Sequence, residues 1–152
     1  MKGYYFHNTD IRSTRAHMSQ ILNTVVNMET HVTIDLVLPK YHGKAGPNAI
    51  KRNHDLEKMP PIIFLNNFGI QSSGTFAMIL FNIPAILFLC TKKVRKEVNF
   101  VYVRSNLFLP LAFVARLLFV PIFYEIHRKQ LGFGEQIREN IMCQLVSGMI
   151  VI

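Results

Sequence analysis

The hydrophobic residues of this chain follow two different spacings. Segment 13–28 repeats them at intervals of three and four, which places them on one side of a helix. These residues are Met18, Ile21, Leu22, Val25 and Val26. Elsewhere apolar residues form short continuous runs, typical of buried strands, with helical patterns in most of the intervals. The runs occupy 3–7, 31–40, 61–65, 99–105, 120–127 and 148–152.

Strands that alternate with helices predict a parallel sheet covered on both faces, because right-handed crossovers place a helix over one face or the other. We therefore predict an α/β fold, a Rossmann-like three-layer domain with a mostly parallel sheet of about six strands. The exception is segment 41–60, which is polar and basic and contains Gly43, Gly46 and Pro47. There we expect a loop with one short helix.

Length and charge restrict the kind of protein and its partners. The chain has 152 residues, half of them hydrophobic, which suffices for one domain and is too short for two ordinary ones. Its formal charge of +8 favours anionic partners such as nucleic acid, phospholipid headgroups or phosphorylated small molecules. Nucleic acid fits poorly, because most of the 12 Phe residues lie inside apolar runs. We expect no nucleic-acid partner.

Two segments are apolar enough to raise the question of a membrane span. Segment 76–90 is shorter than the roughly 20 residues that a spanning helix needs, and Asn82 and Pro84 interrupt it. Segment 107–124 carries Arg116, which costs about 2.5 to 3.5 kcal/mol at the centre of a bilayer. A small basic membrane protein with two hydrophobic helices stays open as the alternative to the α/β domain.

A basic cluster follows the first of these apolar segments. It consists of Lys92, Lys93, Arg95 and Lys96. Such a cluster is often only a solvated helix end, but beside an apolar helix it could rest on anionic lipid. The N-terminus lacks the apolar stretch of a signal peptide, and Cys90 and Cys143 lack pairing or metal-ligand spacing. We expect a cytoplasmic protein that can lie peripherally on the cytoplasmic face of a membrane.

Polar residues gather at the ends of the predicted strands. They are His7, Asn8 and Asp10, then Asn66 and Asn67, then Arg104 and Ser105, and finally Glu125, His127 and Arg128. In open α/β sheets ligands bind outside the carboxyl ends of the strands, so these residues predict a ligand-facing rim. Glu125 and His127 share one strand face, because alternate side chains of a strand point the same way.

The segment after the first predicted strand carries a second group of candidates. Arg15 and His17, in the first turn of the predicted helix, could face a phosphate at the helix N-terminus or simply form a solvated turn. His7, His31, His42 and His54 lack the mutual spacing of a zinc site. We expect no metal.

Three stretches of the chain resemble a known family. They are "STRAHMSQILNTVVNMETHVTIDLVLP", "VYVRSNLFLPLAFVARLLFVPIFYEIH" and "ENIMCQLVSGMIVI". Together they look like the N-terminal domain of family 4 glycosyltransferases of the GT-B fold, in which Glu-x-His often ends the fifth strand and Arg the fourth. One departure is that Arg12 and Ser13 stand where the family usually has a glycine pair. Without those glycines a phosphate or sugar approaches the backbone less closely.

The resemblance implies an activity and a division of labour between two domains. Such enzymes move a sugar from a nucleotide-sugar donor to a glycan or lipid-linked acceptor, as in polysaccharide biosynthesis, with retention of configuration and without metal or cofactor. Residues 1–152 would form the single acceptor-side domain. The second Rossmann-like domain, which binds most of the donor, is absent from this sequence. We therefore expect the chain to be a fragment or part of a split gene, and to be inactive alone.

The resemblance also suggests roles for individual residues. His127 is the candidate catalytic residue, because the histidine at this place contacts the hydroxyls of the donor sugar; the alternative is a solvated histidine on the rim. The candidate substrate-binding residues are Arg104, Glu125, Arg15, His17 and Ser13. Glu125 is expected to orient a neighbour or to pair with a base such as Arg104 or Arg128, because buried carboxylates need partners.

Overall fold

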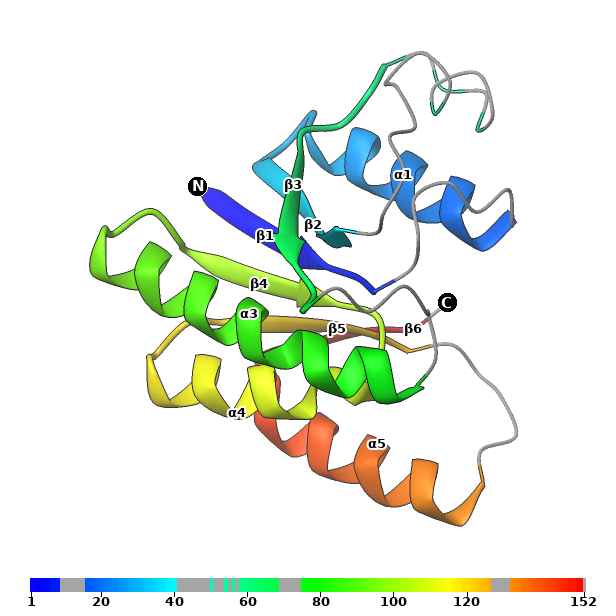
Figure 1. The fold of residues 1–152 in the computed structure, drawn as a ribbon, viewed down its shortest axis with the longest axis vertical. Coiled ribbons are helices and arrows are strands. Elements are labelled where there is room, and N and C mark those ends of the chain that lie inside the picture. The colour runs from blue at the N-terminus through cyan, green and yellow to red at the C-terminus, as the bar shows by residue number, and fades with distance from the viewer. Residues whose placement is uncertain are drawn as a thin grey trace.

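A six-stranded sheet, in which every pair of neighbouring strands is parallel, forms the centre of the computed structural model (Figure 1). The structure describes residues 1–8, 16–40, 50, 54, 56, 58–68, 75–126 and 132–151. The strands are β1 (Lys2–Phe6), β2 (Thr33–Lys40), β3 (Ile62–Asn66), β4 (Phe100–Val103), β5 (Ile122–Ile126) and β6 (Gly148–Val151). Their order across the sheet, β3-β2-β1-β4-β5-β6, is that of a Rossmann fold. The predicted fold class is confirmed.

Helices cover both faces of the sheet (Figure 1). They are α1 (Ala16–Met28), α3 (Thr75–Val94), the short 3-10 helix η1 (Asn106–Phe108), α4 (Leu109–Leu117) and α5 (Phe133–Leu145). Helix α1 covers one face, and α3, α4 and α5 cover the other (Figure 1). The hydroxyl of Tyr124 on β5 donates to Glu139 Oε2 of α5 at 2.6 Å, which ties this helix to the sheet.

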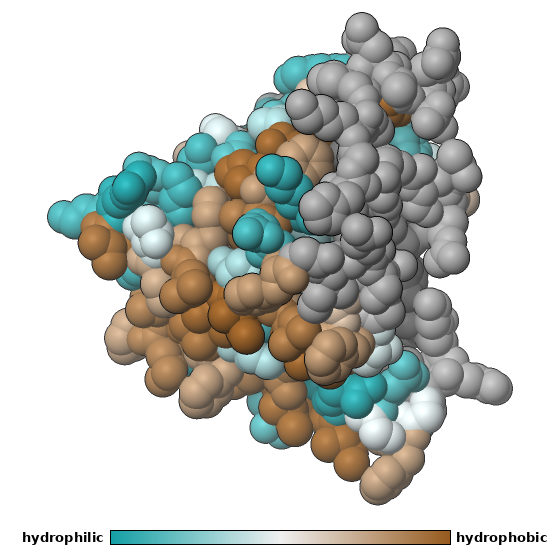
Figure 2. Space-filling view, in the orientation of Figure 1, coloured by the Kyte–Doolittle hydropathy of each residue, from teal (hydrophilic) through white to brown (hydrophobic). Residues whose placement is uncertain are grey.

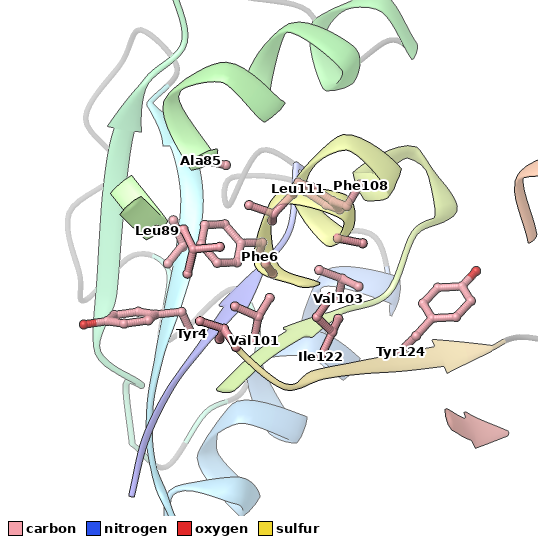
Figure 3. Close-up of a cluster of buried hydrophobic side chains, with 14 of the residues drawn as sticks. Tyr4, Phe6, Ala85, Leu89, Val101, Val103, Phe108, Leu111, Ile122 and Tyr124 are labelled. Atoms are coloured by element: carbon pink, nitrogen blue, oxygen red, sulfur yellow. The ribbon is translucent and has the colours of Figure 1, made fainter. Parts of the chain in front are cut away.

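The alternation of side chains along each strand produces two separate apolar cores. Tyr4 and Phe6 contribute to the core beneath α3 and α4, whereas Tyr5 contributes to the core beneath α1. Figure 3 shows the first core, where strand residues such as Val101 and Val103 lie near Leu111 of α4. Because both faces of the inner strands are buried, these strands are largely apolar, which is why they were recognisable as continuous runs.

A close approach between β1 and β4 explains the glycine at position 3. Gly3 is paired with Phe100 across the two strands. A Cβ atom on Gly3 would lie 2.1 Å from Cζ of the Phe100 ring, well inside the distance at which carbon atoms repel each other. The absence of a side chain at Gly3 therefore gives the ring of Phe100 its place against the sheet.

Helix α3 is longer than the apolar segment 76–90, since it extends to Val94 and contains both Asn82 and Pro84. Among the described residues it alone has the length and composition of a membrane-crossing helix. Its buried side chains are Ala77, Met78, Phe81, Asn82, Ala85 and Leu89. Helix α3 buries this side against the sheet, and it lies in the chain between β3 and β4, two strands of that sheet. It is therefore a crossover helix that covers the sheet.

The second apolar segment does not form the continuous helix that a two-helix membrane protein would need. Segment 107–124 contains most of η1, all of α4, a turn and most of β5. The last part of this apolar run is buried as a strand between β4 and β6, so its hydrophobicity serves the sheet. The alternative of two hydrophobic helices is therefore wrong.

Asn82 joins α3 to the beginning of α4. Its Nδ2 donates to the carbonyl oxygen of Leu107 at 3.0 Å, and its Oδ1 accepts from the N–H of Leu111 at 3.3 Å. The N–H groups in the first turn of a helix have no partner within the helix, and Phe108 at the start of α4 supplies no side-chain cap. Asn82 thus satisfies a helix end from a neighbouring helix.

Candidate functional site

The order of the strands places a ligand-binding crevice at the carboxyl ends of β1 and β4. From β1 the chain passes through α1 to β2 on one side, and from β4 through α4 to β5 on the other, so the order of the strands reverses between β1 and β4. Ligands of open α/β sheets bind where the strand order reverses in this way. Phe6 is paired with Val103 across the two strands, so His7 and Arg104 are the first residues beyond that pair. Both are buried, and both follow strand residues at the predicted rim.

Arg104 and Glu125 form a buried ion pair at this edge. Arg104 Nε lies 3.2 Å from Glu125 Oε1, and the two side chains are only 5% and 1% exposed. The expected pairing of Glu125 with a neighbouring base is therefore confirmed for Arg104. Two buried charges of opposite sign offset each other's loss of hydration, so removing either one leaves the other uncompensated.

Two further side chains complete the surroundings of this pair. The Tyr102 hydroxyl donates to Glu125 Oε2 at 2.8 Å, and Arg104 Nη2 donates to Gln20 Oε1 of α1 at 2.8 Å. Burial, and then the hydrogen bond to Glu125, raise the pKa of Tyr102 far above its usual value, so it stays a protonated donor. The ring of Tyr5 packs edge-on against that of Tyr102, with centroids 4.7 Å apart, and burial raises the Tyr5 pKa as well.

We call the buried residues Tyr102, Arg104 and Glu125 the buried polar cluster. It joins β4 to β5 on the α1 side of the sheet, and Gln20, which is exposed on α1, contacts it through Arg104. Both oxygens of Glu125 are engaged, one by Tyr102 and one by Arg104. A carboxylate held in this way is suited to positioning its neighbours, and it is poorly placed to take a proton from a substrate.

Three other described residues expected on the rim, His7, Ser105 and Asn67, have structural partners or lie in the interior. The N–H of His7 donates to the carbonyl oxygen of Val37 at 3.1 Å, which continues the pairing of β1 with β2. Ser105 Oγ accepts from the N–H of Leu107 at 3.3 Å and caps η1. Asn67, just after β3, is completely buried. Among the described rim residues, His7 and Ser105 thus fix the local backbone and Asn67 lies in the interior.

Several candidates fall outside the described part of the chain. These are Asp10, Arg12, Ser13, Arg15, His127 and Arg128. His17 belongs to the first turn of α1, but its side chain is outside the described part. Of the candidate residues, the structure therefore brings together Arg104 and Glu125. Their partners Tyr102 and Gln20 were not among the sequence candidates.

A metal site needs several imidazole, thiolate or carboxylate ligands close together. Within these ranges, no group of three or more His, Cys, Asp or Glu side chains is arranged to hold a metal ion. The buried polar cluster contains one carboxylate, which is already paired with a guanidinium. A cationic metal would have to compete with Arg104 for that carboxylate.

Comparisons with known proteins support the fold. No family model matches the chain, and no curated protein does. Among solved structures it is similar to a Listeria monocytogenes protein described as a UDP-N-acetylglucosamine 2-epimerase, with a TM-score of 0.61 and 10% identity. The match covers 99% of this chain and 39% of that protein, so the chain spans about two fifths of its neighbour's length. The chain therefore has a Rossmann-like α/β fold, which matches part of a GT-B-like protein.

Proposed function

We propose that this domain is the acceptor-side half of a GT-B glycosyltransferase, which moves a sugar from a nucleotide-sugar donor to a glycan or lipid-linked acceptor. The observation that carries the proposal is the buried Arg104–Glu125 pair at the carboxyl ends of β4 and β5. It lies beside the strand reversal where open α/β sheets bind ligands. The sequences "YVRS" and "YEIH" resemble the strand ends of family 4 glycosyltransferases, and this resemblance is the reason for proposing sugar transfer as the reaction.

In this proposal the buried polar cluster has a positioning role. Glu125 holds Arg104 and accepts from Tyr102, so it fixes the end of β5 relative to β4. The chain continues from β5 to His127, which would contact the hydroxyls of the donor sugar. A rigid support of this kind matters because transition-state contacts depend on small distances. We assign no metal and no cofactor to the reaction.

The donor would be bound mainly by a second Rossmann-like domain. This part of the proposal is supported by the similarity to a protein of which the chain covers 39%. Half of a preorganised site contributes little transition-state stabilisation, so residues 1–152 alone should bind the donor weakly and transfer no sugar. Ser13, Arg15 and His17 remain the candidate substrate-binding residues of the segment after β1 in this proposal.

Sugar transfer by the two-domain enzyme tests the proposal. Purified enzyme is incubated with radiolabelled nucleotide sugars and with glycan or lipid-linked acceptors, and the labelled product is measured. We expect His127→Ala to lower turnover about 10- to 1,000-fold, the cost of one lost transition-state hydrogen bond, with an unchanged melting temperature.

Three results would contradict the proposal. An active His127→Ala enzyme would remove the role of that residue. Transfer by residues 1–152 alone would show that no second domain is needed. A nucleotide sugar that changes its configuration without any acceptor would instead indicate an epimerase, the activity by which the similar Listeria protein is described.

A further inference from the structure

The outer side of α3 and α4 carries an unusual set of exposed apolar side chains. They are Phe76, Ile79, Ile83 and Leu87 on α3, Phe113 and Leu117 on α4, and Phe119 directly after α4. We call these residues the apolar face. The two helices contact each other, and Figure 2 shows brown surface extending over both. Leu87 is 64% exposed and Phe119 is 89% exposed.

The apolar face is not needed to build the core. On α3 a separate set of residues, including Phe81, Ala85 and Leu89, already packs against the sheet. Single exposed apolar residues are common on soluble proteins, but a continuous surface contributed by two neighbouring helices marks an interaction site. Something apolar is therefore expected to cover this side of the molecule.

The charges around the apolar face indicate what that partner is. Neither α3 nor α4 contains Asp or Glu, whereas Lys92 and Lys93 lie in the last turn of α3. Figure 1 shows that α3 and α4 run back to the edge of the sheet where β4 and β5 begin. Lys96 follows α3 and Phe119 follows α4 in the chain, so both lie toward this edge. The carboxylate of Glu97 already pairs with Lys92 at this edge, and Lys93, Arg95 and Lys96 leave it net positive, so a second copy of the same face would add repulsion. A bilayer that contains anionic lipid offers both acyl chains and negative headgroups.

The backbone at Phe119 provides an independent observation. Its φ is 53°, in the left-handed region where glycine is the ordinary residue. The N–H of Phe119 donates to the carbonyl oxygen of Arg116, and that of Val120 donates to Ala115, as in a helix end that glycine normally completes. An exposed aromatic ring in this conformation gains little from the fold. The same ring would gain from insertion at the boundary between headgroups and acyl chains.

We propose that the apolar face binds the surface of an anionic membrane, with Phe119, Leu87 and Leu117 at the acyl boundary and Lys93 and Lys96 among the headgroups. Helix α3 lies along the membrane in this arrangement. Crossing the bilayer would withdraw it from the sheet, where it connects β3 to β4 and buries one side against the core. This inference does not depend on the proposed glycosyltransferase activity.

Co-sedimentation with vesicles tests the proposal directly. One set of vesicles is neutral phosphatidylcholine, and the other contains phosphatidylglycerol as well. We expect binding to the anionic vesicles that weakens as salt shortens the screening length from about 30 Å at 0.01 M to about 10 Å at 0.1 M. Equal binding to neutral vesicles at every salt concentration, or no binding to either kind, would overturn the proposal.

Phe119→Gly separates membrane binding from folding. Glycine suits the positive φ of this position, so the melting temperature should stay the same or rise. Binding to anionic vesicles should fall roughly tenfold, because one aromatic anchor is lost. Unchanged binding by this variant would overturn the role of the face. Lipid-free dimers that Phe119→Gly dissociates would show that a second copy covers the face instead.

A matched pair of charge variants tests the basic edge. Lys93→Gln with Lys96→Gln should weaken binding to anionic vesicles about 10- to 30-fold, from roughly 1 kcal/mol for each lysine near such a surface. Lys40→Gln with Lys58→Gln removes the same charge elsewhere; Lys40 ends β2, and Lys58 pairs with Glu29 near the end of α1. This control should bind like the wild type. Equal losses of vesicle binding in both double variants would show that only the net charge of the protein matters, and would overturn the assignment of Lys93 and Lys96 to the headgroups.

Discussion

Replacing Glu125 with glutamine changes the centre of the buried polar cluster with little change in shape. Glutamine keeps one oxygen that can accept from the Tyr102 hydroxyl, but it removes the negative charge that faces Arg104. The guanidinium would then remain in the interior without its counter-charge. We expect a loss of stability together with a loss of any activity that depends on this edge of the sheet.

The burial of the pair sets the size of this effect. The side chain of Glu125 is 1% exposed and that of Arg104 is 5% exposed, so water screens the pair very little. Breaking a buried ion pair by removing one partner costs about 3 to 5 kcal/mol. The retained hydrogen bond from Tyr102 favours the lower end. For a chain of this size, about 3 kcal/mol corresponds to a fall of roughly 6 to 12 °C in melting temperature.

Urea denaturation is the suitable assay, because urea leaves the ionic strength unchanged and the free energy of unfolding follows from linear extrapolation. Arg104→Met serves as the matched partner variant. The double variant of Glu125→Gln with Arg104→Met should lose less stability than the sum of the two single losses, since no buried charge is left alone. A Glu125→Gln protein within about 0.5 kcal/mol of the wild type would refute this account of the pair.

Two further substitutions test the packing of the sheet and of the helices. Gly3→Ala should lower the free energy of unfolding by about 1 to 3 kcal/mol, because the added Cβ meets the ring of Phe100. Phe100→Leu in the Gly3→Ala background should recover part of this loss. A Gly3→Ala protein of full stability would contradict the close approach. Asn82→Ala should lower the free energy of unfolding by about 1 to 3 kcal/mol, because the N–H of Leu111 loses its acceptor inside the protein. Urea denaturation measures this loss. A fully stable variant would show that the link between α3 and α4 is dispensable.

The inner strands were predictable from the sequence because both of their faces are buried, as in β4. The apolar runs 61–65 and 99–105 correspond to β3 and β4, with ends that differ by at most two residues, although β3 at the edge of the sheet is only half-buried or exposed. Segment 107–124 shows the limit of this signal. Composition alone does not distinguish a helix followed by a buried strand from one apolar helix, because both are continuously hydrophobic.

The candidate site was predictable only where polar residues interrupt an apolar run. Arg104 and Glu125 stand out at strand ends, and their pairing followed from the cost of burying a lone charge. Tyr102 lies within an apolar run, although its position two residues before Arg104 places it on the same strand face. Gln20 and Asn82 lie on helices, and their partners are on other elements, so only the tertiary structure reveals their roles.

The central position of β1 also has a consequence for how the protein folds during synthesis. β1 is paired with β2 on one side and with β4 on the other, and the contact between Lys2 and Asn99 joins residues 97 positions apart. At about 5 to 20 residues per second, a ribosome needs roughly 5 to 20 s to make the intervening chain. Throughout that interval one edge of β1 has no native partner, and non-local pairing of this kind is slow and exposed to aggregation. Nascent chains that end before β4 should therefore depend on chaperones more than longer chains do.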